Sequence, residues 1–201
     1  MGLATKRITE VPHYTGIKVE VWFDLGARKA GQTMSIGFVQ RVGHEIHCID
    51  YLEDDGAGRG LPWVAQEMQQ KQTQLGYVYG DIVWPHDGGH IQKATGETLA
   101  ETFRKLTNFT PIVLDVDAVG PGIDATRNML SRMFWDATRC ERWVEALRNY
   151  RREWDEDRKT FKPHPHADWS AHAADMTRTG AVHVPNDWVG KDRMIKRKAV
   201  I

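Results

Sequence analysis

The chain has 201 residues, enough for one domain with a substantial core but short for two. Its 41% hydrophobic and 27% charged residues are ordinary for a globular protein, and no apolar run approaches the roughly 20 residues of a membrane span. The 27 basic and 27 acidic residues give zero net charge, which excludes strong electrostatic attraction of the whole chain to nucleic acid. Either nucleic acid is not the ligand, or the chain acts while tethered to something that holds it.

Strand patterns open the chain. Residues 1–16 have no clear period and are expected to be a lead-in or linker. Over residues 18–24 apolar and polar side chains alternate, which is the period of a half-buried strand. Two more runs, at 34–39 and 46–52, follow after turns. Together they predict a three-stranded antiparallel meander.

The middle of the chain alternates helices with short strands. Residues 61–75 and 97–106 have helical spacing, whereas 82–84 and 112–114 are apolar runs without alternation, as in buried strands. This element order predicts an α/β fold with one mixed central sheet flanked by helices. The first strand should lie at its centre, with the meander on one side and the fourth and fifth strands on the other.

The last third of the chain is mostly helical. Helices are predicted over residues 121–132, 139–153 and 169–179. Residues 155–166 are polar, contain proline and are expected to form a loop or small hairpin. We therefore predict one domain over residues 17–182, followed by a basic tail over 183–201.

Two carboxylates follow strands that should be neighbours. Asp24 closes the first strand before Leu25-Gly26, and Asp87 closes the fourth after Pro85-His86. Because these strands are predicted to be parallel, both acids should emerge at the same sheet edge, where α/β folds build their sites. An aspartate before glycine is by itself more often turn chemistry than a ligand.

A third carboxylate lies in the last predicted helix. Trp169, Ala173 and Met176 form an apolar stripe that can pack on the sheet, while Asp168, His172 and Asp175 share another face. Asp168 is best interpreted as the helix N-cap. A helix that crosses the sheet near its active edge would bring Asp175 to Asp24 and Asp87.

Three clustered carboxylates predict a metal site. They repel one another unless cations join them, and Mg²⁺ or Mn²⁺ prefers oxygen ligands. Two such ions, about 4 Å apart, can activate a water and stabilise the leaving oxygen of a phosphodiester. This chemistry needs no nucleophilic side chain.

Six motifs follow in a fixed order from Lys18 to Thr179. They are Trp22-Phe23-Asp24-Leu25-Gly26, Ile49-Asp50-Tyr51, the Leu61-Pro62 helix start, Gly76-Tyr77, Pro85-His86-Asp87 and Asp168-Trp169-Ser170-Ala171-His172-Ala173-Ala174-Asp175. The set resembles the C-terminal nuclease domain of large terminase subunits of tailed bacteriophages. The resemblance implies a ribonuclease H-like fold. It also implies that Asp24, Asp87 and Asp175 bind metal and cleave double-stranded DNA during genome packaging.

The same resemblance implies partners and auxiliary residues. His172, His86 and Asp168 would support the triad, while it leaves open whether Asp50, Glu53 or Asp117 joins the metal shell. The implied partners are double-stranded DNA, an ATPase motor domain absent from this chain, a portal and a small terminase subunit. The implied location is the host cell cytoplasm.

Two features depart from the family pattern. The loop after Asp24 carries Arg28 and Lys29 but lacks an extra acid expected in many relatives. The stretch from Gly26 to Thr33 imitates a phosphate-binding loop, but Gln32 replaces the required lysine, so it does not supply the missing motor.

Two other functions remain open from the sequence. One keeps the fold and makes the chain a resolvase or integrase-like nuclease for a particular DNA structure. The other is a non-catalytic module that docks a packaging motor. Retention of Asp24, Asp87 and Asp175 argues against the docking module, because docking needs no metal site.

Overall fold

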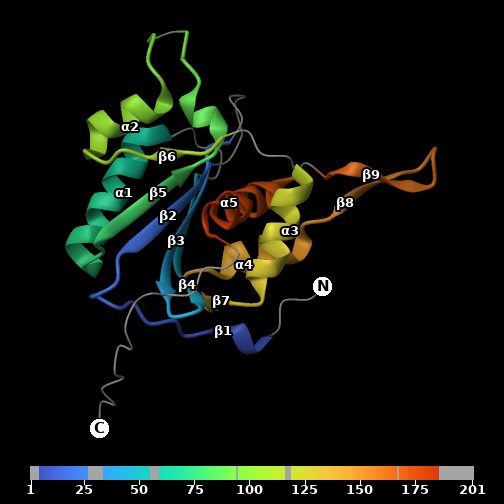
Figure 1. Cartoon of the computed structure of the whole chain (residues 1–201), viewed down its shortest axis with the longest axis horizontal. Coiled ribbons are helices and arrows are strands. Elements are labelled where there is room, and N and C mark those ends of the chain that lie inside the picture. Colours follow the sequence, from blue (N-terminus) through green and yellow to red (C-terminus); the bar gives the residue numbers. More distant parts are fainter. Residues whose placement is uncertain are drawn as a thin grey trace.

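The computed structural model describes residues 5–26, 34–54, 59–93, 95–115, 119–166 and 168–185. Within these residues, seven strands form one mixed sheet in the order β1-β7-β4-β3-β2-β5-β6 (Figure 1). The strands are β1 (Ile8–Thr9), β2 (Val19–Asp24), β3 (Met34–Val42), β4 (Glu45–Asp54), β5 (Tyr79–Trp84), β6 (Ile112–Val113) and β7 (Met133–Asp136).

The centre of the sheet has the predicted arrangement. β2, β3 and β4 form the antiparallel meander, and β2 pairs in parallel with β5, with Trp22 opposite Val83. β5 in turn pairs in parallel with β6. Because β2 and β5 are parallel neighbours, the chain leaves both strands at the same edge of the sheet.

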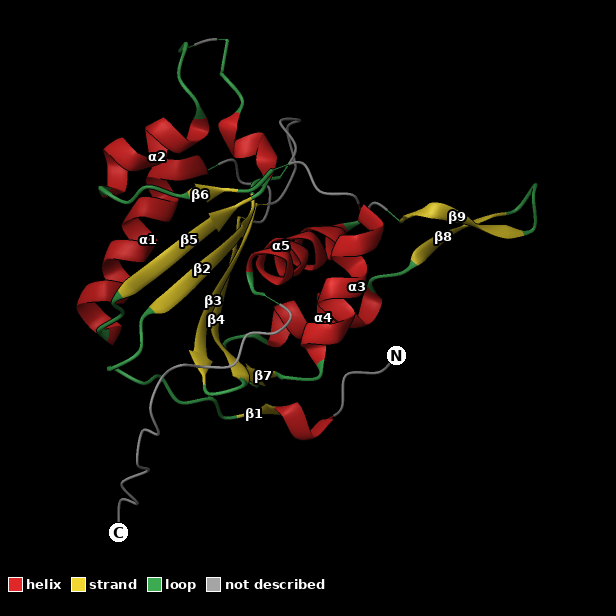
Figure 2. Cartoon of the chain, viewed as in Figure 1, coloured by secondary structure: helices red, strands yellow, loops and turns green. Residues whose placement is uncertain are grey.

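Helices cover both faces of the sheet (Figure 2). They are α1 (Gly60–Leu75), α2 (Leu99–Thr107), α3 (Val119–Leu130), α4 (Glu141–Asn149) and α5 (Trp169–His183). One core joins the sheet to α1 and α2, and a second joins it to α3, α4 and α5. In the part of the chain that the structure describes, every helix is too short or too polar to cross a bilayer.

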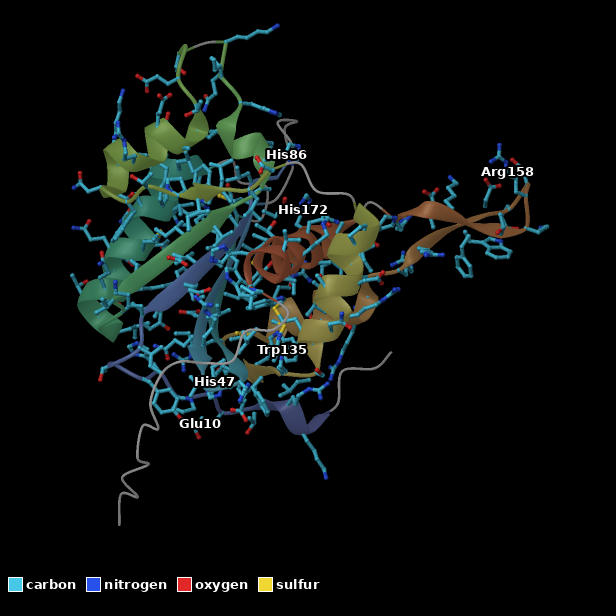
Figure 3. The ribbon with its side chains drawn as sticks, in the orientation of Figure 1. Glu10, His47, His86, Trp135, Arg158 and His172 are labelled. Carbon is cyan, nitrogen blue, oxygen red and sulfur yellow. The ribbon has the colours of Figure 1, made fainter. Side chains whose placement is uncertain are left out.

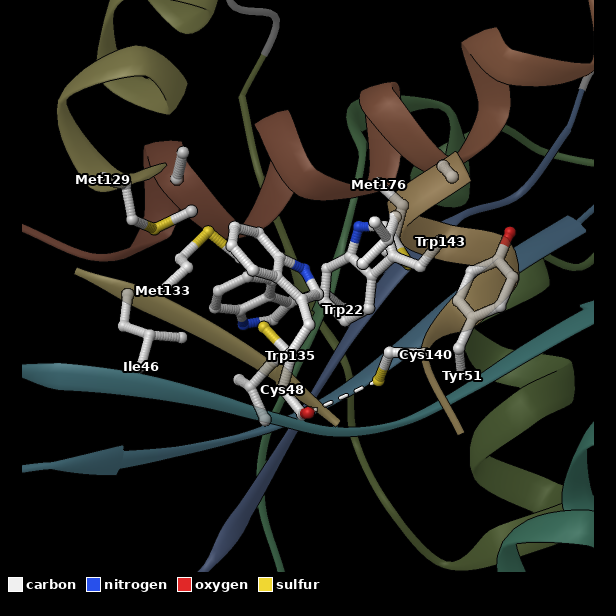
Figure 4. Close-up of a cluster of buried hydrophobic side chains, with 14 of the residues drawn as sticks. Trp22, Ile46, Cys48, Tyr51, Met129, Met133, Trp135, Cys140, Trp143 and Met176 are labelled. Carbon is white, nitrogen blue, oxygen red and sulfur yellow. Dashed lines mark hydrogen bonds between the residues drawn. The ribbon is translucent and has the colours of Figure 1, made fainter. Parts of the chain in front are cut away.

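β2 is buried on both faces, which corrects the half-buried strand predicted from its alternation. Val21 and Phe23 belong to the core beneath α1 and α2, whereas Trp22 belongs to the core beneath α5 (Figure 4). Glu20, between Val19 and Val21, is buried in an ion pair with Arg41. The polar positions of the pattern are therefore filled by a large aromatic residue and a paired charge.

Two glycines allow α5 to lie directly on the sheet. A Cβ at Gly180 would lie 2.1 Å from Cδ2 of Trp22, so only glycine fits between the helix and this ring. A Cβ at Gly37 on β3 would lie 2.9 Å from the side chains of Met176 and Trp143. These contacts set the height and direction of α5, and hence where its N-terminal half meets the edge.

Elements too short to show a period were missed. The sequence did not predict β7, where Met133 and Trp135 are buried, because four residues between two helices are too few for a pattern. It also did not predict β1, which pairs with β7 although residues 1–16 were expected to be a lead-in or linker. The described part of that segment, with buried Val11, therefore packs on the domain.

The expected loop or hairpin is a hairpin. β8 (Arg152–Asp155) and β9 (Thr160–Pro165) pair in antiparallel fashion and project away from the sheet (Figure 1). α4 consequently ends at Asn149, four residues before the predicted end of that helix.

Several predictions fall outside the described residues. These are the loop with Arg28 and Lys29, the candidate ligand Asp117, and the basic tail beyond residue 185. The domain limits at residues 17 and 182 likewise stay predictions.

Candidate metal centre

Asp24 is the last residue of β2 and opens onto the sheet edge. Its side chain is 18% exposed, and Oδ2 accepts a hydrogen bond from Nδ1 of His172 on α5 at 2.8 Å. Gly26 has φ +66° and turns the chain away directly after the buried Leu25. Asp24 is therefore held at the end of a rigid strand and joined to α5.

Asp87 lies in the short 3-10 helix η2 (His86–Gly89) after β5. Gly88 anchors this turn, since a Cβ there would lie 2.6 Å from the ring of Trp84. Among the described residues, Oδ1 of Asp87 is buried without a hydrogen-bond partner. Burial raises the pKa of this carboxyl, and the charge of Asp24 raises it further. Asp87 thus has an unsatisfied oxygen close to a second carboxylate.

Asp175 lies one helical turn after His172. Burial is the main cause that raises the pKa of Asp175 to about 6; Arg178 lowers it and Asp24 raises it. Oδ1 of Asp175 accepts an ion-paired hydrogen bond from Arg178 at 2.7 Å. The carboxylate of Asp175 therefore has a cationic partner on its own helix.

Asp24 is the common neighbour of these acids. Its charge contributes to the raised pKa values of both Asp87 and Asp175, so the strand, the turn and the helix converge at one edge. Within the described residues, however, no three His, Cys, Asp or Glu side chains are gathered closely enough to hold an ion together. Asp24 and Asp175 are each paired with a residue of α5, whereas Oδ1 of Asp87 has no partner among the described residues.

His172 connects the strand to the helix electrostatically. Its hydrogen bond to Asp24 is the largest cause of a raised pKa, which burial opposes and the charges of Asp175 and Glu53 support. The imidazole and His86 lie toward the same end of the molecule in Figure 3. His86 itself is exposed, with its ring 5.8 Å from that of His90, and its charge lowers the pKa of Asp87.

Asp168 caps α5, as predicted. Its side chain accepts a hydrogen bond from the backbone N–H of Ser170 at 2.9 Å and pairs with Arg151 at 2.9 Å. Burial alone would raise the pKa of Asp168, but these two partners outweigh it and lower the pKa. The described contacts of this carboxylate are thus those of a helix cap.

The sequence left open whether Asp50 or Glu53 joins the metal shell, and the structure places these two acids differently. Asp50 is buried against the other helical layer, where Lys71 of α1 contacts it at 2.5 Å. Glu53 lies in the same cross-strand row as Asp24, because Ser35 is opposite both residues. Of the two, only Glu53 is on the side of His172.

Trp169 corrects one sequence interpretation, and Arg178 and Arg142 were missed. The sequence predicts Trp169 in the apolar stripe that packs on the sheet, but it is 38% exposed, and the guanidinium carbon of Arg142 lies 3.8 Å from its ring centroid. Arg178 had a sequence signal, since it is three residues after Asp175 on a helix. No sequence signal pointed to Arg142, because it contacts Trp169 from a different helix.

A central β2, an antiparallel meander and parallel β5 and β6 define the class of fold. It is the ribonuclease H-like fold, as the sequence predicted. Neither a family model nor a curated protein matches the chain.

Solved structures do match, and they are large terminases. The large terminase of a thermophilic bacteriophage superposes with a TM-score of 0.65 and 12% identity, over 90% of this chain and 42% of that chain. The g2p (large terminase) nuclease domain of bacteriophage SPP1, with bound Mn, superposes with a TM-score of 0.56 and 13% identity, over 83% of this chain and 86% of that chain. The large terminase nuclease of a second thermophilic phage, G20c, with bound cobalt, superposes with a TM-score of 0.57 and 10% identity, over 90% of this chain and 96% of that chain.

These likenesses establish the fold. The chain spans less than half of the first of these large terminases but most of the two separate nuclease domains. The resemblance in fold that the sequence motifs predict is therefore confirmed.

Proposed function

We propose that this chain is the metal-dependent nuclease domain of a phage DNA-packaging machine and cuts double-stranded DNA. The observation that carries the proposal is the convergence of Asp24, Asp87 and Asp175 at one sheet edge, with Asp24 raising the pKa of both other acids. Support comes from the shared fold with SPP1 and G20c nuclease domains that bind Mn, cobalt or magnesium.

The donor set fits a hard divalent cation. All three residues offer carboxylate oxygens, which Mg²⁺ and Mn²⁺ prefer, and Oδ1 of Asp87 is buried with no partner among the described residues. Asp175 is held by Arg178 and Asp24 by His172. Metal binding would therefore displace Arg178 from Asp175 and draw the carboxylates together, while His172 keeps its bond to one oxygen of Asp24.

Each residue would have a defined part in the reaction. Bound at this edge, two divalent ions would supply an activated water and charge stabilisation for the phosphodiester being cleaved. Asp24, Asp87 and Asp175 would hold them, so the chain needs no nucleophilic side chain of its own. His172 would orient Asp24 through its Nδ1–H, as outer hydrogen bonds do for metal-binding carboxylates.

The packaging context is part of the proposal. Because the chain spans only 42% of the first large terminase that it matches, the remainder of such a protein would contain the ATPase motor that moves the DNA. The portal and the small terminase subunit are proposed as further partners. The site of action would be the cytoplasm of the host cell.

The decisive test replaces each acid with asparagine. Asp24→Asn, Asp87→Asn and Asp175→Asn keep the volume but remove a charge and a strong ligand, so Mn²⁺-supported nicking of supercoiled plasmid should fall by orders of magnitude. Metal-free melting temperatures of the Asp87 and Asp175 variants should stay equal or rise, because the raised pKa of each carboxyl indicates a disfavoured charge, whereas Asp24→Asn loses the charge that pairs with His172 and should melt at an equal or lower temperature. Asp168→Asn is the matched control, since asparagine caps helices nearly as well and cleavage should largely survive.

The outcome also separates the alternatives. Full activity in one of the three variants would remove that residue from the site, and full activity in two would refute the mechanism. Preference for four-way junctions over linear duplex would indicate a resolvase-like enzyme. Complete absence of metal-dependent nicking by the pure wild-type protein would favour a docking module.

A further inference from the structure

An arginine is stacked on an exposed tryptophan beside the candidate metal centre. The guanidinium of Arg142, on α4, covers the ring of Trp169, the first residue of α5, at 3.8 Å. Nε of Arg142 donates to Oε2 of Glu53 on β4 at 3.1 Å. We call these three residues the Arg142 stack; they come from three different elements and join at one place on the surface.

The Arg142 stack lies close to the edge where the acids converge. Glu53, Ser35 and Asp24 are paired in one row across β4, β3 and β2. Directly paired residues point to the same face, and neighbouring strands are about 4.8 Å apart, so Glu53 and Asp24 are separated by roughly 10 Å. Trp169 is the first residue of α5, so the Arg142 stack lies on the side of the sheet that α5 covers.

Tyr51 gives a second indication of proximity. Its hydroxyl accepts or donates a hydrogen bond with Oγ of Ser35 at 3.0 Å. Burial raises the pKa of this hydroxyl, and the charges of Glu53, Arg142 and Asp24 all act on it. Arg142 and Asp24 are therefore both within electrostatic reach of one side chain.

The guanidinium of Arg142 is held in place, but not all of its N–H donors have a partner among the described residues. One face is against Trp169 and Nε is bonded to Glu53, yet the Arg142 side chain is 47% exposed. Nη1 is 3.9 Å from the carboxylate of Glu145, longer than a hydrogen bond. Among the described residues, neither terminal nitrogen has a partner within hydrogen-bond distance. Such a planar group can bind a phosphate through two parallel N–H donors.

We propose that Arg142 binds a phosphate of the DNA backbone a few nucleotides from the one that is cleaved, with Trp169 and Glu53 as positioning residues. The inference rests on the proposed nuclease function. The roughly 10 Å between Glu53 and Asp24 is about three times the 3.4 Å of helix axis per nucleotide of a strand, so the contact falls on a phosphate a few nucleotides from the cleaved one. Trp169 and Glu53 hold the guanidinium plane, so little side-chain freedom is lost on binding.

The test measures DNA binding without cleavage. Fluorescein-labelled linear duplex is titrated with wild-type protein and variants in EDTA over a series of salt concentrations. Arg142→Gln should weaken binding about fivefold to tenfold at low salt. The slope of log K against log salt should fall by about one, the value for one lost phosphate contact. Arg142→Lys keeps the charge and should retain the slope but bind more weakly, because the planar fork is lost.

A matched control and a variant of opposite sign exclude a merely structural role. Arg104 is exposed on α2, across the sheet, so Arg104→Gln removes the same charge and should leave the slope unchanged. Glu53→Gln keeps an oxygen that can accept from Nε of Arg142 but removes a negative charge beside the bound phosphate, so affinity should rise. If the ion pair has only a structural role, Glu53→Gln and Arg142→Gln should both lower the melting temperature, and both should bind DNA as the wild type does.

The inference is overturned if Arg142→Gln binds with the affinity and slope of the wild type, or if the wild type binds no duplex at the lowest salt. It is also overturned if Glu53→Gln and Arg142→Gln change affinity in the same direction. Plasmid nicking by the wild type in Mn²⁺ is measured in parallel. Wild-type cleavage with unaltered binding by Arg142→Gln would reject the phosphate contact and leave the proposed function standing. Weaker binding by Arg142→Gln, with no cleavage by the wild type, would reject the nuclease function and retain the phosphate contact.

Discussion

Asp175 shows how single residues set the state of the candidate centre before metal binds. It is paired with Arg178 at 2.7 Å, while Asp24 is paired with His172 at 2.8 Å. Both partners lie on α5, so the helix that brings the third acid also brings the groups that neutralise two acids. Any divalent ion at this edge has to compete with a guanidinium for Asp175.

Replacement of Arg178 should reveal that competition. Arg178→Gln is expected to raise Mn²⁺ affinity several-fold, because Asp175 no longer has to leave a cation. Arg178 also lowers the pKa of Asp175, so its loss moves the pKa above about 6 and protonation would oppose metal binding near that pH. The Mn²⁺ titration, followed by electron paramagnetic resonance, is therefore made well above that pH.

Arg127 provides the matched control for Arg178. It forms the same i,i+3 pair with Asp124, at 3.0 Å, on the exposed surface of α3. Arg127→Gln should leave Mn²⁺ affinity unchanged. Unchanged or weaker Mn²⁺ binding by Arg178→Gln would mean that Arg178 does not compete for the site.

At the scale of elements, the placement of α5 decides where His172 and Asp175 lie. The helix rests on Trp22 through Gly180, and the ring of Trp22 belongs to the central strand that ends in Asp24. The same strand therefore carries the helix and one acid. A shift of the helix against β2 would move Asp175 relative to Asp24.

Gly180→Ala should destabilise the fold by about 1 to 3 kcal/mol or more, the usual cost of overpacking, because its Cβ would lie 2.1 Å from Trp22. Gly120→Ala is the control, since nothing lies within 4 Å of a Cβ there. It should be neutral or stabilising by up to about 1 kcal/mol, through helix propensity. Urea unfolding of both variants measures the difference. Equal stability of Gly180→Ala and wild type would show that α5 does not pack as described.

At the scale of the whole molecule, the charge balance limits what the isolated chain can do. With 27 basic and 27 acidic residues, it has no net attraction for a polyanion, although single arginines such as Arg142 are exposed. In the proposed context, a motor that already grips DNA supplies the affinity.

The isolated chain should therefore bind random duplex weakly and with strong salt dependence. Fusion to a DNA-holding ATPase motor should raise cleavage at low DNA concentration, since tethering gives an effective concentration on the order of mM without new contacts. Fluorescence anisotropy of the separate and fused proteins on the same duplex measures this. Tight binding of duplex by the isolated chain at physiological salt would contradict the tethering account.

The sequence alone determined the elements that repeat a pattern over enough residues. The meander, α1, α5 and its cap Asp168 could all be predicted, because side-chain period and capping are local properties. The position of Asp24 at the end of a strand followed from the same patterns, and so did that of Asp87 after one, although Asp87 lies in η2 and does not close β5 itself. β1 and β7 could not be predicted, because two and four residues carry no period and pair only once the sheet has formed.

Tertiary structure alone decided which side chains meet. Burial of β2 on both faces depends on helices from distant parts of the chain, so its alternation suggested an exposed face that does not exist. The pairing of Asp24 with His172, and the stacking of Arg142 on the exposed Trp169, join elements that are far apart in sequence. No local pattern encodes such contacts, because they arise from the packing of α4 and α5 against the sheet.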